Sequence, residues 1–158
     1  MKTCAAFLLA AGVAAVLTAC APLPEVTPAS KPAPDPRTLS TPGCPADARD
    51  LPAGALYGRW EARIEGQAGP AVVQLHKHPD YNGVQGSVAR SGQREARLAG
   101  DIDSDGALSL DESQDGRTIS ATWSAPLRVG SCGTTFEGSW RNAADDSVHA
   151  FTLQKTGN

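Results

Sequence analysis

The chain has 158 residues, with 14 basic and 17 acidic side chains and a formal net charge of −3. This length predicts one domain, and the slightly acidic balance gives no electrostatic basis for binding nucleic acid. A charged fraction of 20% beside 41% hydrophobic residues excludes a wholly disordered chain, and 16 glycines, 12 prolines and few aromatics do not favour a helical bundle.

The N-terminal residues 1–19 have the pattern of a secretory signal peptide. Lys2 provides a positive charge, and an apolar run of mostly small residues follows from Ala5 to Val16. This run is shorter than the roughly 20 apolar residues of a membrane-spanning helix, and it is typical of the hydrophobic region of a signal peptide. It ends in Leu17-Thr18-Ala19-Cys20, which resembles the lipobox of bacterial lipoproteins, Leu-x-Ala/Gly-Cys.

The resemblance to bacterial lipoproteins covers residues 1–20. It implies that residues 1–19 are removed and that Cys20 becomes the first mature residue, acylated with chains such as palmitate. Ala21 follows instead of an aspartate, which implies sorting to the outer membrane, with the domain in the periplasm or at the cell surface. Several acyl chains, at about 0.8 kcal/mol per buried CH₂, make a firm membrane anchor. The alternative is an ordinary secretory signal with an incidental cysteine.

The four cysteines divide between the two parts of the chain. Cys4 lies within the signal peptide, and Cys20 is assigned to the lipid. Cys44 and Cys132 remain as one pair in an oxidising compartment, which predicts a disulfide between them. This bond would close a long loop and contribute about 4 kcal/mol. Neither cysteine lies in a Cys-x-x-Cys motif, which disfavours a metal site.

Residues 20–51 are predicted to be the lipidated cysteine and a proline-rich tether. Nine of the 12 prolines fall between Pro22 and Pro52, and proline removes backbone donors and favours extended geometry. This composition indicates a semi-rigid spacer, or alternatively a docking motif for a partner. With Cys44 fixed to the domain, residues 21–43 would reach roughly 70 Å at about 3.1 Å per residue. The domain itself is predicted over residues 52–158.

From Leu56 onward, apolar and polar residues alternate with a period of two, which predicts strands that are buried on one face. The pattern runs through Leu56 to Glu65, Ala71 to His78, Gly83 to Arg90, Glu95 to Asp103, Ala107 to Asp111, Arg117 to Ser124, Cys132 to Arg141 and Ser147 to Lys155. Turn dipeptides such as Asn82-Gly83 and Asp105-Gly106 separate these runs. The prediction is an all-β antiparallel meander of about eight strands, forming a small up-and-down barrel. A β-sandwich is the alternative. Inward glycines (Gly58, Gly86, Gly100, Gly138) favour strongly curved strands.

Gly58-Arg59-Trp60 in the first predicted strand resembles the Gly-x-Trp motif of the lipocalin and avidin group. This resemblance implies a barrel that binds a small molecule, with Trp60, Trp123 and Trp140 lining its cavity. The alternative is that the first tryptophan packs in the core beside a strand glycine.

Two groups of residues are candidates for metal binding. Asp101, Asp103, Asp105 and Glu112 match the ligand positions of the calcium-loop pattern D-x-D-x-D-G-x₅-E. The flanking sequence favours a hairpin over the two helices of an EF-hand, so we expect these carboxylates to be solvated and separated.

His76 and His78 share one face of a strand, and Asp80, Tyr81 or His149 are their available partners. Two ligands do not complete a site. We therefore expect no metal and no cofactor.

The chain carries no catalytic constellation that we recognise. Gly-x-Ser-x-Gly, phosphate-loop and dinucleotide-binding patterns are missing from the sequence, and the acidic pairs Asp111-Glu112 and Asp145-Asp146 are expected to be solvated. The leading hypothesis is a non-enzymatic envelope lipoprotein that binds or inhibits a protein, or has a structural role. The alternatives are a lipocalin-like or avidin-like binder and a metal-dependent hydrolase, which would need His76, His78 and His149 to converge.

Overall fold

The computed structural model describes residues 43–52 and 54–157, so the predicted signal peptide and Cys20 lie outside the described residues. Eight strands form a closed barrel in which each strand pairs with its neighbours in sequence. The elements are a short 3₁₀ helix η2 (Ala48–Asp50), β1 (Gly58–Ile64), β2 (Ala71–Lys77), β3 (Val84–Ala89), β4 (Ala96–Ile102), β5 (Ala107–Ser113), β6 (Ala121–Pro126), β7 (Thr135–Asn142) and β8 (Val148–Gly157). Within the described residues, no helix has the length and apolarity needed to cross a lipid bilayer.

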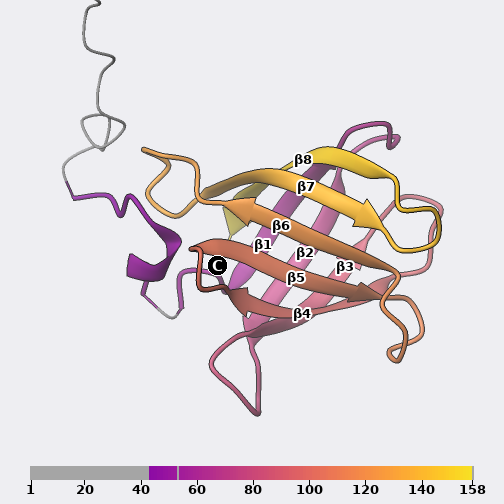
Figure 1. Cartoon of the computed structure of the whole chain (residues 1–158), viewed down its shortest axis with the longest axis horizontal. Coiled ribbons are helices and arrows are strands. Elements are labelled where there is room, and N and C mark those ends of the chain that lie inside the picture. Colours follow the sequence, from indigo (N-terminus) through magenta and orange to yellow (C-terminus); the bar gives the residue numbers. More distant parts are fainter. Residues whose placement is uncertain (1–42, 53, 158) are drawn as a thin grey trace, which may run out of the picture. The chain divides into compact units, whose positions relative to one another are not determined.

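Antiparallel pairing between β1 and β8 closes the barrel (Figure 1). The predicted meander is therefore confirmed, and the alternative of two packed sheets is wrong. The alternating pattern gives every strand one apolar face that must be covered. A closed barrel covers those faces with one another and leaves no unpaired strand edge in its wall.

The barrel interior is a packed core. The side chains of Trp60, Trp123 and Phe136 are almost completely buried. The ring of Trp60 lies 5.8 Å from that of Phe136, and the ring of Trp123 lies 4.8 Å from that of Phe151 in an edge-to-face arrangement. An eight-stranded barrel is just wide enough for its own side chains to fill, and here leucines and valines from β2, β3, β4, β5 and β8 complete the filling.

Three inward glycines allow neighbouring strands to approach closely. A Cβ atom at Gly86 would overlap the carbonyl oxygen of Gln74, and one at Gly138 would overlap the carbonyl oxygen of Ser124. The third, Gly100, faces the backbone of β5 in the same way. These positions require glycine because the strands coil tightly to close a small barrel, as expected from the sequence.

Replacing Gly138 by alanine is expected to lower the free energy of unfolding by about 3 kcal/mol, because the new methyl group would overlap the backbone of β6. Urea denaturation measures this change. Gly157→Ala in β8 is the matched control, because its Cβ would lie at an ordinary distance of 3.8 Å from the Cβ of Arg59. Equal destabilisation by the two substitutions would contradict the explanation.

One end of the barrel is covered by an N-terminal strap, defined as residues 43–52. Within the strap, Ala48 of η2 is buried, and Arg49 donates a 2.9 Å hydrogen bond from Nη1 to the carbonyl oxygen of Ser104 in the β4–β5 connection. Asp47 caps η2, and its hydrogen bonds from Arg49 lower the pKa of Asp47 to about 2. We call this end the closed end. It is the left end in Figure 1.

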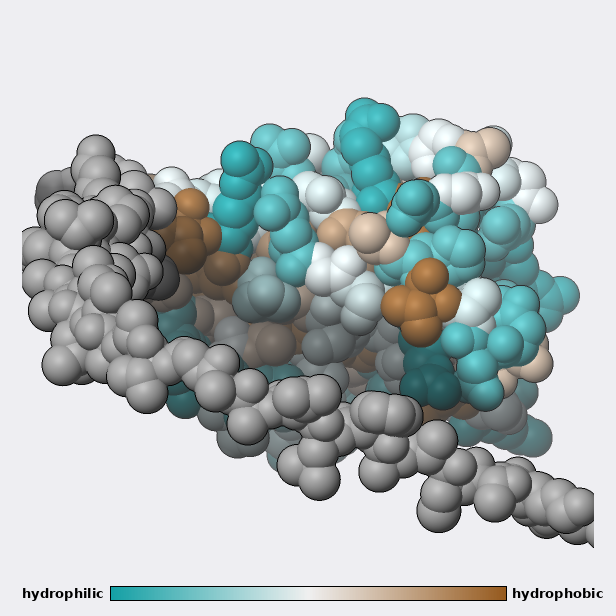
Figure 2. Space-filling view, turned by 45° about the horizontal axis from the view of Figure 1, so that its top comes forward, coloured by the Kyte–Doolittle hydropathy of each residue, from teal (hydrophilic) through white to brown (hydrophobic). Residues whose placement is uncertain are grey.

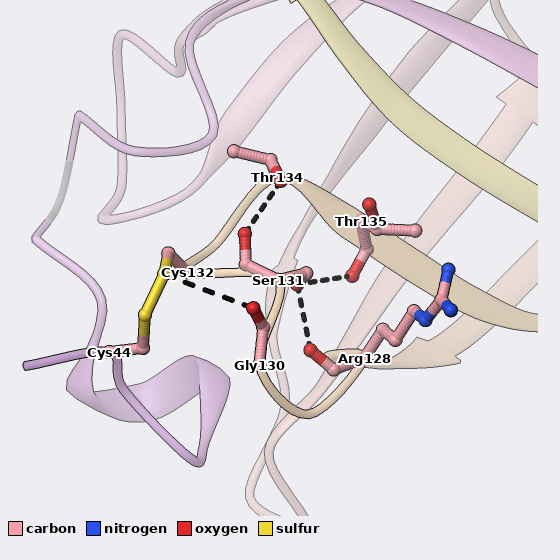
Figure 3. Close-up of a disulfide and its surroundings, with 7 residues drawn as sticks. All are labelled: Cys44, Arg128, Gly130, Ser131, Cys132, Thr134 and Thr135. Carbon is pink, nitrogen blue, oxygen red and sulfur yellow. Dashed lines mark hydrogen bonds between the residues drawn. A yellow bond between two sulfur atoms is a disulfide. The ribbon is translucent and has the colours of Figure 1, made fainter. Parts of the chain in front are cut away.

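A disulfide joins the strap to the barrel, which confirms the predicted pairing of Cys44 with Cys132. Their Cα atoms are 4.6 Å apart. Figure 3 shows Cys132 at the tip of the β6–β7 connection, beside Ser131 and Thr134. The Ser131 hydroxyl donates to the Arg128 carbonyl at 2.7 Å, and the Thr134 hydroxyl donates to the Ser131 carbonyl at 2.6 Å. These bonds hold the connection in the shape that presents Cys132 to the strap.

Trp60 also secures the closed end. Its Nε1 donates to the carbonyl oxygen of Leu56 at 2.9 Å. The Lys155 ammonium lies 5.5 Å from the centroid of the Trp60 ring and donates to the carbonyl oxygen of Ala55 at 2.7 Å. The segment that leads into β1 is therefore tied to the last strand, and Trp60 serves as part of the core.

Candidate functional site

The opposite end of the barrel, which we call the open end, contains a depression with a volume of about 590 Å³. The connections 65–70, 90–95, 114–120 and 143–147 surround it. All four connections contribute lining residues, namely Gln67, Gln93, Gln114 and Ala144 among others. The volume falls within the range of about 300–1,000 Å³ that is typical of small-ligand sites.

A buried ion pair lies in this depression. Arg90 immediately follows β3 and Glu112 lies on β5, and their side chains are only 7% and 2% exposed. The guanidinium donates from Nη1 to Oε1 and from Nη2 to Oε2 of the carboxylate, both at 2.7 Å. Two parallel charge-assisted hydrogen bonds fix both the distance and the plane of the pair.

Two indoles complete the cluster. Trp123 Nε1 and Trp140 Nε1 both donate to Glu112 Oε2, at 3.0 and 3.2 Å. The guanidinium carbon of Arg90 lies 5.7 Å from the centroid of the Trp123 ring and 5.8 Å from that of Trp140, which is within cation–π distance. We call Arg90, Glu112, Trp123 and Trp140 the Arg90 cluster.

Every buried side-chain nitrogen and oxygen of the Arg90 cluster has a hydrogen-bond partner, except one. The Nε of Arg90 is buried and has no hydrogen-bond partner among the described residues. An unpaired buried donor carries a desolvation cost of about 1–3 kcal/mol, and burying the ion pair itself is also costly. Charged groups retained at such cost beside a depression mark a candidate functional site.

The sequence-based expectation that Glu112 is solvated is wrong. The inward alternation of Leu108 and Leu110 on β5 continues to Glu112, and Arg90 and the two indoles supply its hydrogen bonds. The alternation over Arg117 to Ser124 predicted a strand with Ile119 on the same buried face as Ala121 and Trp123, and for Ile119 this prediction is wrong. Ile119 lies in the 114–120 connection with 47% of its surface exposed, because β6 begins only at Ala121.

The connections at the open end are held by local hydrogen bonds. Asp115 accepts the backbone N–H groups of Thr118 and Arg117, both at 2.8 Å, and these bonds lower the pKa of Asp115 to about 2. In the 143–147 connection, Asp145 accepts from the Ser147 hydroxyl and backbone, which lowers the pKa of Asp145. Side chains around the depression are therefore carried on ordered turns.

The acidic residues of the calcium pattern do not converge. Asp103 lies in the β4–β5 hairpin at the closed end, where its Oδ1 accepts the N–H groups of Asp105 and Ala107, both at 2.9 Å. Glu112 lies near the far end of β5, in the Arg90 cluster. Among the described residues, no group of three or more His, Cys, Asp and Glu side chains is placed to hold a metal ion.

Millimolar calcium is expected to leave the melting temperature unchanged, because Asp101 lies on β4, Asp103 and Asp105 lie in the hairpin before β5, and Glu112 lies near the far end of β5. Differential scanning calorimetry with and without calcium measures this. Magnesium at the same concentration controls for ionic strength. A rise of many degrees with calcium alone would show that the hairpin binds the ion, since a ligand that binds only the folded state stabilises it.

The histidines are also dispersed. His78 packs on Tyr81, with ring centroids 3.9 Å apart, in the connection after β2. His76 lies on the outer wall, where it lines a hollow together with His78 and Arg97. His149 is beside Trp140, with ring centroids 5.8 Å apart, at the other end of the barrel. The arrangement proposed for a hydrolase, with three converging histidines, is therefore not formed by these side chains.

The three tryptophans do not line one cavity. Trp60 belongs to the core near the closed end, and Trp123 is buried beneath the depression. Trp140 is half-buried and lines the depression itself. Of the residues predicted to contact a small ligand, Trp140 alone lies at a surface that a ligand reaches.

The outer surface is mainly polar. Figure 2 shows a face that is largely hydrophilic, with hydrophobic residues in a few places. The large hydrophobic side chains with substantial exposure are Val72, Tyr81, Ile119, Val129 and Val148. They belong to different strands and connections.

The similarity of the chain to known proteins is found among solved structures. No protein-family model matches the chain, and no curated protein matches it. Among solved structures, a redesigned β-barrel is similar at 20% sequence identity with a TM-score of 0.43, covering 72% of this chain and 97% of that chain. The architecture described above therefore rests on the strand pairing of the chain itself.

Proposed function

We propose that the chain is an envelope lipoprotein whose small barrel is a non-catalytic module for binding a protein partner. The lipobox pattern that ends at Cys20 supports a lipid anchor in the outer membrane, and the proline-rich segment after it supports a spacer. The disulfide between Cys44 and Cys132 supports an oxidising compartment. In this proposal the anchor sets the location, and the barrel provides the binding surface.

The packed barrel interior is the observation that carries the binding proposal. Trp60, Trp123 and Phe136 fill the space that a lipocalin-like binder would leave for its ligand. Recognition must therefore use the outer surface and the ends. In the Arg90 cluster, both oxygens of Glu112 are occupied by hydrogen bonds, which supports a positioning role and not proton transfer.

The anchor is tested by growing cells with an alkyne-labelled palmitate and comparing Cys20→Ser with the unaltered chain. We expect the unaltered chain to carry the label and the Cys20→Ser chain to lose it and leave the membrane fraction. Cys4→Ser is the matched control, because this cysteine precedes the lipobox, and it should label normally. Labelling that persists in Cys20→Ser would refute the anchor.

Binding is tested by placing a photo-crosslinking amino acid at Ile119 and, separately, at Val148, two exposed apolar positions. Ultraviolet irradiation of living cells is expected to give a discrete adduct with one envelope protein from at least one position. Asp50 at the closed end is the control position. The absence of a discrete adduct from both positions, or an identical set of adducts from all three, would contradict specific protein binding.

A further inference from the structure

The depression at the open end has the features of a ligand site in its own right. It is a hollow with a volume of about 590 Å³, and four separate connections converge on it. Its lining includes Arg90, whose side chain is more than nine-tenths buried and whose Nε has no hydrogen-bond partner among the described residues. The unpaired Nε is itself buried, so the contacts of a ligand in the depression would come from the other lining groups.

The charge of the site indicates an uncharged ligand. Arg90 and Glu112 neutralise each other at 2.7 Å, and the other lining side chains carry no charge. They are Gln67, Gln93, Gln114, Thr118, Ile119, Ser120, Trp140, Asn142, Ala143 and Ala144. An anion in the depression would lie about as close to the Glu112 carboxylate, which repels it, as to the guanidinium, which attracts it. For a cation the attraction and the repulsion are exchanged. Neither gains net attraction from a paired site.

The lining also indicates which neutral groups the ligand carries. Gln67, Gln93, Gln114 and Asn142 bring four side-chain amides to the depression from different parts of the chain. An amide offers both donors and an acceptor, and a hydroxyl group does the same. In Asn142, Oδ1 accepts the N–H of Ala144 at 3.0 Å, which orients the amide. A ligand with several hydroxyl groups would pair with such amides.

Trp140 adds an apolar contact to this polar lining. Its indole is held by the bond from Nε1 to Glu112 and by the nearby guanidinium of Arg90. A half-buried indole presents a rigid apolar surface at a wet site. Amides that bond hydroxyls, beside a fixed aromatic ring that contacts C–H groups, match the two kinds of surface on a sugar ring.

We propose that this depression binds an uncharged saccharide. An extended peptide is the competing class, because its backbone also pairs with amides. Peptides commonly bind by adding a strand to a sheet edge or by lying along a groove. The closed barrel offers no edge in its wall, and the depression is enclosed by connections from four sides. The proposal goes beyond the proposed function and does not depend on the lipid anchor or on the protein partner.

The test follows the indole N–H signals of the full-length, isotope-labelled chain by nuclear magnetic resonance. The chain has three tryptophans, and Trp140→Phe assigns the signal of interest. The probes are chitotetraose, maltotetraose and tetra-alanine, each added to millimolar concentration. We expect one of the saccharides to shift the Trp140 signal in a saturable manner while the Trp60 signal stays in place.

Variants at the rim locate the binding. The double substitution Gln93→Ala with Gln114→Ala removes two exposed amides and is expected to weaken saccharide binding at least tenfold. Gln154→Ala, on the exposed face of β8, is the matched control and should bind normally. The proposal is overturned by a Trp140 signal that neither saccharide shifts, by a shift with tetra-alanine alone, or by equal affinity in the rim and control variants. None of these outcomes bears on the crosslinking or labelling experiments.

Discussion

Glu112→Ala is expected to lower the free energy of unfolding by about 3–5 kcal/mol. The substitution leaves the Arg90 guanidinium buried without its counter-ion, and it removes the acceptor for the indole N–H groups of Trp123 and Trp140. The loss exceeds what a cavity of that size would cost, because two buried donor side chains and one half-buried donor lose their partner together. Urea denaturation followed by tryptophan fluorescence measures the change.

Two further variants separate this explanation from a loss of packing. Glu137→Ala removes the partner of Arg128 in an exposed pair at 3.6 Å, and it should change stability by no more than about 0.5 kcal/mol. Replacing Arg90 and Glu112 together by methionine removes both charges and should cost clearly less than Glu112→Ala alone. A double variant less stable than Glu112→Ala would show that the ion pair is not the source of the effect.

The paired substitution Cys44→Ser with Cys132→Ser is expected to cost about 4 kcal/mol, because the bond closes a long loop of the unfolded chain. The sequence separation of 88 residues places it among long loops. Chemical denaturation of the variant and of the unaltered chain under oxidising conditions measures the difference.

Reducing conditions provide the control for this second prediction. The unaltered chain in excess reductant should then unfold at the same denaturant concentration as the serine variant. Ser131→Ala, which removes a hydroxyl from the same connection but keeps the disulfide, should cost about 1 kcal/mol. A serine variant as stable as the oxidised chain would show that the bond does not constrain unfolding.

The barrel could be predicted because its strands repeat one simple pattern. In β1, Trp60 and Ala62 alternate with Arg59 and Arg63, and the structure buries the first pair and exposes the second. The glycines that face inward were also informative, since closely coiled strands need positions without a Cβ atom. Both features are local, so they do not depend on knowing which strands pair.

The Arg90 cluster could not be predicted by the same method. A search for apolar alternation ends β5 at Asp111 and discards Glu112 as polar, although Leu108 and Leu110 set the register that turns it inward. Its partner Arg90 is 22 residues earlier, and their meeting depends on how β3, β4 and β5 align. A charged residue that continues an inward series was the available clue.

The position of the strap could not be predicted from local sequence patterns either. Residues 43–52 have proline-rich composition and no periodicity, so the sequence assigns most of them to a tether. Their placement depends on contacts with distant residues, including Ser104 and Cys132. Tertiary contacts and a covalent bond, not propensity, determine where this segment lies.

The position of the disulfide has a mechanical consequence. A pulling force that arrives through residues ahead of Cys44 passes across the bond to Cys132 and enters the wall between β6 and β7. Each of these strands is hydrogen-bonded to neighbours on both sides, so the load is distributed over several ladders. Residues 45–57 are bypassed and carry none of the tension. Under reducing conditions the same force would act directly on the strap and then on Gly58, peeling β1 away from its neighbours.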